Sequence, residues 1–197
     1  GPSKLSGMTR SVRHLVEQTA LAMSSAVLFV LFFQLNGWVF AHFAYNDGIS
    51  WVFLPAGFRV ILVLVLGIPG ALGLVLGSWF IDSALFSVDT WLLPFLNGLV
   101  SGLTPWLVMK YLQHKGWLAP HIMSMSAQRL LHMTLIFSAA SAISHQLLWW
   151  LFERPDANIL VDVWPMFIGN ALGALLMLYG FKFALDRIRP NRSSPTD

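Results

Sequence analysis

The chain alternates long apolar stretches with short polar ones. A helix needs about 20 mainly apolar residues to cross the roughly 30 Å hydrocarbon core of a bilayer. Six stretches meet or nearly meet that length, and the polar segments between them are too short to build a separate soluble domain. The pattern predicts an all-α integral membrane protein, a compact bundle of about six transmembrane helices. The predicted spans are 20–44, 51–67, 69–87, 91–112, 130–152 and 164–186.

The second and third predicted spans are short and are joined by the sequence Gly67-Ile68-Pro69-Gly70. Pro and Gly interrupt a helix, and four residues leave room for little more than a tight turn. We therefore expect these two spans to form a helical hairpin.

Composition agrees with a membrane protein. Hydrophobic residues make up 56% of the chain and charged residues 11%, with a mean hydropathy of +0.67. The absence of Cys excludes disulfides, thiolate catalysis and Cys-ligated metals. The net charge of +3 lies beside apolar segments, so it is better explained by membrane topology than by nucleic-acid binding.

The basic residues also predict the orientation, because Lys and Arg favour cytoplasmic loops. Ten of the twelve lie on one side of the predicted spans, and the opposite loops are mainly acidic. With six spans, both termini are then cytoplasmic, and we expect a multi-pass protein of the bacterial inner membrane in contact with the lipid bilayer. The ten basic residues are Lys4, Arg10, Arg13, Lys110, Lys115, Arg129, Lys182, Arg187, Arg189 and Arg192.

Three segments are distinguished by composition. Residues 1–7, GPSKLSG, are typical of a protease-cleavage and cloning remnant, so we expect the natural chain to begin at Met8. Residues 8–187 are expected to form one six-helix membrane domain. Residues 188–197 form a polar tail that we expect to be disordered.

Small residues recur four positions apart in several predicted spans. In lipid such pairs let helix backbones approach closely, because packing holds membrane helices together. They predict a compact bundle and do not indicate an activity. The pairs are Gly73 and Gly77, Gly98 and Gly102, and Gly169 and Gly173.

Arg59 is the one charged residue in the second predicted span, WVFLPAGFRVILVLVLG. It lies about 12 Å from either end at 1.5 Å per residue, where a charge normally faces inward and has a partner. We also expect Pro55 and Gly57 to keep the start of the span irregular, which would move Arg59 toward the outer surface. Two interpretations stay open: a structural pair with Asp82, or recognition of a small anionic ligand.

Other polar and aromatic side chains fall at a similar depth when positions are counted from the loops. Such groups inside a membrane protein either join helices or form a binding site. They predict a ligand-binding pocket in the outer half of the bundle. Its predicted lining is Arg59, Asp82, His145, Asn170, Asn97 and Trp149.

No sequence motif for catalysis is present: there is no HExxH, no glycine-rich phosphate loop and no GxSxG. His42 and His145 could hold a haem between two helices, but no spacing signature supports that pair. We expect no enzymatic activity, no catalytic residue, no metal and no cofactor.

The segment FLPAGFRVILVLVLGIPGALGLVLGSWF, residues 53–80, resembles the start of MASE-type integral membrane sensor domains. A second segment, FIGNALGALLML at 167–178, looks like a helix of the same family, with Asn170 at a position that is acidic there. The resemblance implies a signal-receiving membrane module that acts through a separate membrane or cytoplasmic protein partner. The matching residues are Pro55, Ala56, Gly57, Pro69, Gly70, Leu76 and Gly77.

A competing resemblance is to the six-span substrate-binding subunits of energy-coupling-factor transporters, which have short, glycine-packed helices. The leading expectation is a non-enzymatic sensory or regulatory module for signal transduction. The alternative is a small solute-binding or transport protein, and a third class is an assembly factor of a membrane complex that binds no small molecule.

Overall fold

The computed structural model describes residues 2–46, 49–118, 124–155 and 157–188, with side chains from residue 9 onward. Six α-helices account for most of these residues. They are α1 (Pro2–Val39), α2 (Leu54–Leu66), α3 (Ile68–Ile81), α4 (Leu92–His114), α5 (Ala127–Leu151) and α6 (Ile159–Ile188), with 3₁₀ turns at Ala41–Phe43 and Ser83–Leu85.

The prediction of a helical protein with membrane-spanning segments is confirmed in its general form. Three helices are long and apolar enough to cross a bilayer: Thr9–Val39 within α1, α4 and α6. α2 and α3 have 13 and 14 residues, about 20 Å each, which is shorter than the hydrocarbon core. α5 has 25 residues and sufficient length, but it is not among the helices that meet the apolar criterion.

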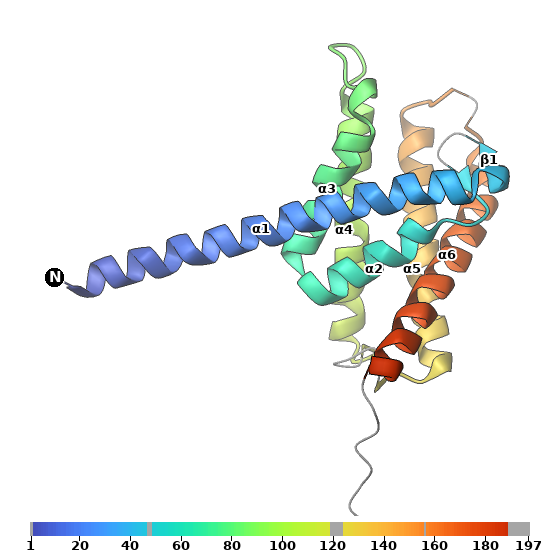
Figure 1. Cartoon of the computed structure of the whole chain (residues 1–197). Coiled ribbons are helices and arrows are strands. Elements are labelled where there is room, and N and C mark those ends of the chain that lie inside the picture. Colours follow the sequence, from blue (N-terminus) through green and yellow to red (C-terminus); the bar gives the residue numbers. More distant parts are fainter. Residues whose placement is uncertain (1, 47–48, 119–123, 156, 189–197) are drawn as a thin grey trace, which may run out of the picture.

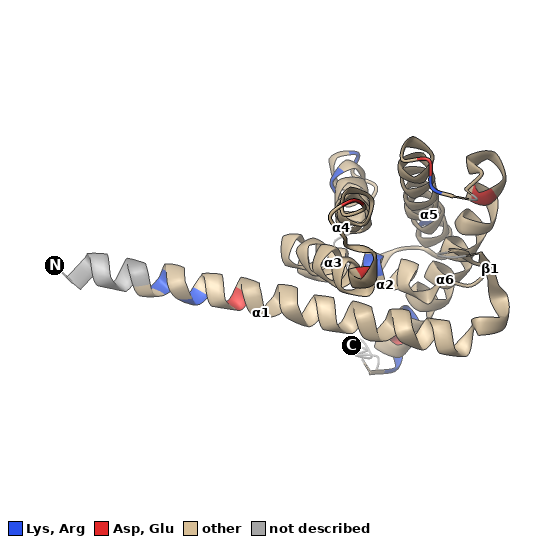
Figure 2. Ribbon diagram, turned by 90° about the horizontal axis from the view of Figure 1, so that it is seen from above, with Lys and Arg blue, Asp and Glu red and all other residues tan. Residues whose placement is uncertain are grey.

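α1 crosses α4, α5 and α6 instead of running alongside them (Figure 1). When the molecule is seen from above, α4 and α5 point toward the viewer while α1 lies in the plane of the picture (Figure 2). α1 begins at Pro2, well before the predicted start of the first span at residue 20. It ends at Val39, five residues before the predicted end at residue 44. Its second half packs on α3, while residues such as Leu15 in the first half are exposed.

A two-stranded antiparallel hairpin follows α1, a feature that the apolar pattern does not predict. β1 (Ala44–Asn46) pairs with β2 (Ile49–Ser50), with Ala44 opposite Ser50 and Asn46 opposite Ile49. The end of this segment contacts α6: the Phe53 amide donates to the Gly169 carbonyl at 3.0 Å. The backbone before α2 is thereby fixed against α6.

α2 and α3 are separated by a single residue, Gly67, whose φ of +62° is a conformation that glycine adopts readily. The expectation that Pro55 and Gly57 lie outside regular helix is wrong, because α2 begins at Leu54. Pro is compatible with the first helical turn, where its missing N–H leaves no helical bond unmade.

α3 ends at Ile81 and not at residue 87, so Asp82 follows the helix instead of lying within it.

Each of the six paired glycines lies against another element. A side chain would collide with the neighbour at five of these positions and make a tight contact at Gly77, so Gly permits the close approach. The neighbours are Ser25 for Gly73, Phe29 and Ala26 for Gly77, Trp79 for Gly98, Ala71 and Val75 for Gly102, Ser50 for Gly169, and Phe53 for Gly173.

The connecting segments gather at two ends. Segments 83–91 and 152–155 lie at one end, and 115–118 lies at the other together with the end of α6 (Figure 1). At this second end the Lys182 ammonium donates to the Met125 carbonyl and the Tyr179 hydroxyl to the Ala127 carbonyl, both at 2.9 Å. Residues 189–197, which contain most of the predicted polar tail, lie outside the described residues.

Candidate functional site

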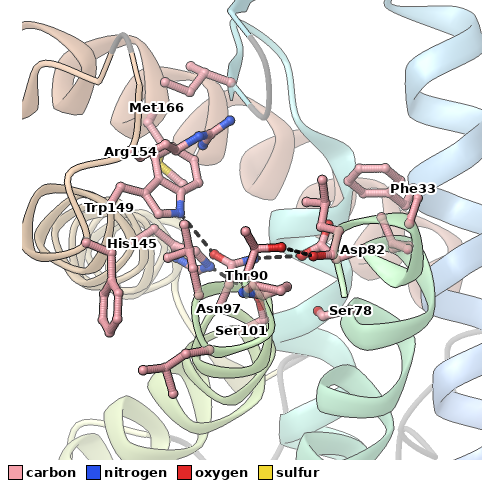
Figure 3. A pocket seen from close by; sticks show the side chains of 18 of the residues that line it. Phe33, Ser78, Asp82, Thr90, Asn97, Ser101, His145, Trp149, Arg154 and Met166 are labelled. Carbon is pink, nitrogen blue, oxygen red and sulfur yellow. Dashed lines mark hydrogen bonds between the residues drawn. The ribbon is translucent and has the colours of Figure 1, made fainter. Parts of the chain in front are cut away.

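A cavity of about 1030 Å³ lies among the helices and extends to segments 84–90 and 152–155 (Figure 3). All six side chains of the predicted pocket line this one cavity, although they come from five separate parts of the chain. They are Arg59 on α2, Asp82 after α3, Asn97 on α4, His145 and Trp149 on α5, and Asn170 on α6.

Arg59 is buried, with 8% of its surface exposed. Its guanidinium carbon lies 5.2 Å from the centre of the Phe29 ring and 5.4 Å from that of Phe53, within the range of cation–π attraction. One terminal nitrogen makes a long 3.5 Å contact with the Ser141 hydroxyl. Within the described residues, Nε of Arg59 has no hydrogen-bond partner.

Arg59 and Asp82 form no salt bridge in the described structure, although both face the cavity. The two charges interact electrostatically across the cavity, but they do not form the direct ion pair considered from the sequence. Unpaired burial of a charge is costly, and a positive guanidinium exposed to a cavity is suited to an anion that enters it.

Asp82 instead belongs to a chain of polar contacts (Figure 3). The Asn97 amide nitrogen donates to Asp82 Oδ2 at 3.1 Å, and the Trp149 indole nitrogen donates to the Asn97 amide oxygen at 3.1 Å. The Arg154 guanidinium lies over the Trp149 ring, 4.1 Å from its centre. One asparagine thus connects the segment after α3 to α5 and fixes the orientation of the Asp82 carboxylate.

His145 is fixed by two serines. Its Nδ1 lies 2.8 Å from the Ser141 carbonyl, and its Nε2 lies 3.2 Å from the Ser101 hydroxyl. Because a carbonyl oxygen only accepts, Nδ1 carries the hydrogen, and Nε2 of the neutral ring accepts from Ser101. Both ring nitrogens of His145 therefore have hydrogen-bond partners within the described residues.

Asn170 is almost completely buried, with 2% exposed, and its amide nitrogen has no partner within the described residues. Neighbouring Gln146 on α5 donates to the sulfur of Met166 at 3.4 Å, a weak bond. Arg59 and Asn170 therefore both present hydrogen-bond donors without partners on elements that line the cavity, and α2 and α6, which carry them, pack together.

Sequence reasoning missed several residues of the site. Ser141, His145 and Trp149 are spaced four residues apart on α5, and Asn97 and Ser101 have the same spacing on α4. Residues four apart lie on the same face of a helix. Examining the positions four residues from His145 and from Asn97 would therefore have identified Ser141 and Ser101. The aromatic contacts of Arg59 left no such signal, because Phe is common in membrane helices.

Metal binding has no support in the part of the chain that the structure describes: no group of three or more His, Asp or Glu is placed to hold an ion. The functional groups at the cavity are guanidinium, carboxylate, amide, imidazole and indole. Such a set can bind a ligand by charge and hydrogen bonding.

Comparison with known proteins found no match: no family model, no curated protein and no solved structure corresponds to this chain. The resemblances to MASE-type sensor domains and to energy-coupling-factor subunits therefore depend on the sequence motifs alone.

Proposed function

We propose that this protein is a multi-pass module of the bacterial inner membrane that binds a small organic anion in its cavity. The observation that carries the proposal is the buried Arg59 guanidinium, which lines the cavity while its Nε has no partner among the described residues. A guanidinium binds a carboxylate through two parallel hydrogen bonds. Asn170, whose amide nitrogen also has no partner, supplies a further donor.

The module has a sensory or regulatory role and no enzymatic activity. Phe29 provides the route by which binding alters packing, because its ring lies beside Arg59 and also against Gly77 of α3. A ligand that draws the guanidinium away from Phe29 removes a cation–π contact and loosens the α1 and α3 interface. A partner protein reads this change on the cytoplasmic side, as the resemblance to MASE-type domains implies.

In this proposal α4, α5 and α6 cross the bilayer, and the C-terminal end of α6 lies in the cytoplasm. The end that carries segments 83–91 and 152–155 is outward, and the end with Lys115, Lys182 and Arg187 is cytoplasmic, in accordance with the preference of basic residues. The cavity, lined in part by the outward segments, is then reached from outside the cell.

The test uses the full chain in lipid nanodiscs and 3-phenylpropionate, which combines one carboxylate with an aromatic body. We expect saturable binding by calorimetry, weakened at least about tenfold in Arg59→Gln, a change in line with loss of a charged hydrogen-bonding group. Arg129→Gln is the matched control, because Arg129 carries the same charge at the exposed start of α5. Equal binding by the wild type and Arg59→Gln would refute the role of Arg59.

A solute-binding or transport function is the second candidate, favoured by the size of the cavity, which suits a drug-sized molecule. Reconstituted vesicles distinguish the two. Uptake of labelled 3-phenylpropionate, or copurification with an ATPase complex, indicates transport, whereas binding without uptake indicates the sensory role. No binding of 3-phenylpropionate or other organic anions, together with stable copurification in a membrane complex, indicates an assembly factor.

A further inference from the structure

The cavity presents opposite charges that interact electrostatically but form no direct salt bridge with each other. Arg59 comes from α2 and Asp82 from the segment after α3, and both line the same cavity without a salt bridge between them. The remaining charged side chains of the lining, Arg154 and Asp89, belong to the outward segments, and Arg154 packs on Trp149. Apart from the outward segments, the charged side chains of the lining are therefore one positive and one negative group, and Arg154 also acts electrostatically on Asp82.

The Asp82 carboxylate is also held in place. Asn97 donates to only one of its two oxygens, and Trp149 fixes Asn97 through the other end of the amide. Burial of Asp82 opposes its ionisation, while the Asn97 hydrogen bond and the nearby Arg154 and Arg59 guanidinium groups favour the charged carboxylate. The Asp82 carboxylate thus has a fixed orientation and still has oxygen lone pairs that can accept hydrogen bonds from a cationic group of a ligand.

We infer that the ligand is a zwitterion, with a carboxylate that binds Arg59 and an ammonium group that binds Asp82. This inference deepens the proposed function and depends on it. An anion without the ammonium group would place its negative charge near the Asp82 carboxylate, whereas a zwitterion offers an opposite charge to each of Arg59 and Asp82. Amino acids and short peptides belong to this chemical class.

The apolar part of the ligand also has a place in the cavity. Phe29, Phe33 and Phe53 line it; Phe29 and Phe53 lie beside Arg59, and the Phe33 and Phe53 rings pack edge to face with centres 5.9 Å apart. Aromatic side chains contribute large apolar contact area in such sites. A zwitterion with an aromatic body thus matches both the charges and the walls.

Three compounds with one aromatic body separate the contributions of the charges: phenylalanine, 3-phenylpropionate without the amine, and 2-phenylethylamine without the carboxylate. Calorimetry on the full chain in nanodiscs is expected to show phenylalanine, or the longer zwitterion glycyl-phenylalanine, binding at least about tenfold more tightly than either single-charge compound. In Asp82→Asn this preference over 3-phenylpropionate disappears, while 3-phenylpropionate still binds and shows that the variant is folded. Asp186→Asn, which removes an exposed carboxylate on α6, retains the preference.

The outcomes distinguish this inference from the function on which it depends. If 3-phenylpropionate binds as tightly as both zwitterions, or if Asp82→Asn keeps the preference, the zwitterion inference is wrong and the anion site of the proposed function remains. If none of the compounds binds, both fail. Asp82→Glu, which keeps the charge, should restore part of the preference if the carboxylate acts by charge.

Discussion

At the residue scale, Asn97 shows how one amide can organise a buried site. Its nitrogen donates to Asp82 and its oxygen accepts from Trp149, so both of its functional atoms are used by groups from other elements. The side chains of Asp82 and Trp149 are therefore oriented by their hydrogen bonds to Asn97 as well as by the backbone that carries them. The consequence is that Asn97 positions Asp82 and Trp149, and its removal leaves two polar groups without these bonds.

Replacing Asn97 with Ala is expected to lower the free energy of unfolding by about 1–3 kcal/mol, because a donor and an acceptor both lose a buried partner. Trp149→Phe removes only the indole N–H and should have a smaller effect. The double variant should be less destabilised than the sum of the two, by about 0.5 kcal/mol or more, because the residues share one bond. Denaturant unfolding in mixed micelles measures all three; strict additivity would show that the bond contributes nothing.

At the element scale, α6 is joined to the segment before α2 by close backbone contact. Gly169 and Gly173 lie against Ser50 and Phe53, and the Phe53 amide bonds to Gly169. This contact fixes the start of α2, which carries Arg59 one and a half turns later. The glycines of α6 thus determine the position of the guanidinium from a distance.

Gly173→Ala should lower the free energy of unfolding by about 1–3 kcal/mol, because its methyl group would meet the Phe53 backbone, which cannot move aside as a flexible side chain can. Gly180→Ala in the same helix is the matched control, since nothing lies within 4 Å of the added atom. There the higher helix propensity of Ala should leave stability unchanged or raise it by up to about 1 kcal/mol. Equal effects at the two positions in the unfolding measurement would contradict the packing role of Gly173.

Much of the helical pattern could be predicted because apolar runs report helices directly. α4 begins within one residue of the predicted start, and α5 ends within one residue of the predicted end. The hairpin at 44–50 could not be seen in that pattern, although Asp-Gly at 47–48 is a common hairpin sequence. Those two residues lie outside the described ones.

The site was accessible to prediction for a different reason. Polar residues in an apolar span are rare, so each one marks an inward position, and counting depth was enough to select six that line one cavity. What counting cannot give is the partner of each group. In the described structure Arg59 and Asp82 form no salt bridge: the guanidinium lies near two phenylalanine rings, and Asn97 binds the carboxylate.

At the scale of the whole molecule, the two ends differ in chemistry. One end carries the acidic segments and part of the cavity wall, and the other carries Lys115, Lys182 and Arg187 (Figure 1). Basic residues favour the cytoplasmic side of a membrane and are attracted to its anionic lipids, so this difference in charge between the ends influences the orientation of the whole protein. Only an assignment of sides can connect the cavity to a compartment and hence to a source of ligand.

The natural absence of Cys makes that assignment direct, because any single Cys is the sole thiol. In intact cells a membrane-impermeant maleimide should label Val88→Cys and Asn158→Cys at the cavity end, and His114→Cys and Asp186→Cys only after permeabilisation. All four positions are exposed, so access differs by side of the membrane and not by burial. Labelling of Val88→Cys and His114→Cys from the same side would mean that α4 does not cross the bilayer. Labelling of the His114 and Asp186 variants alone would invert the molecule and open the cavity to the cytoplasm.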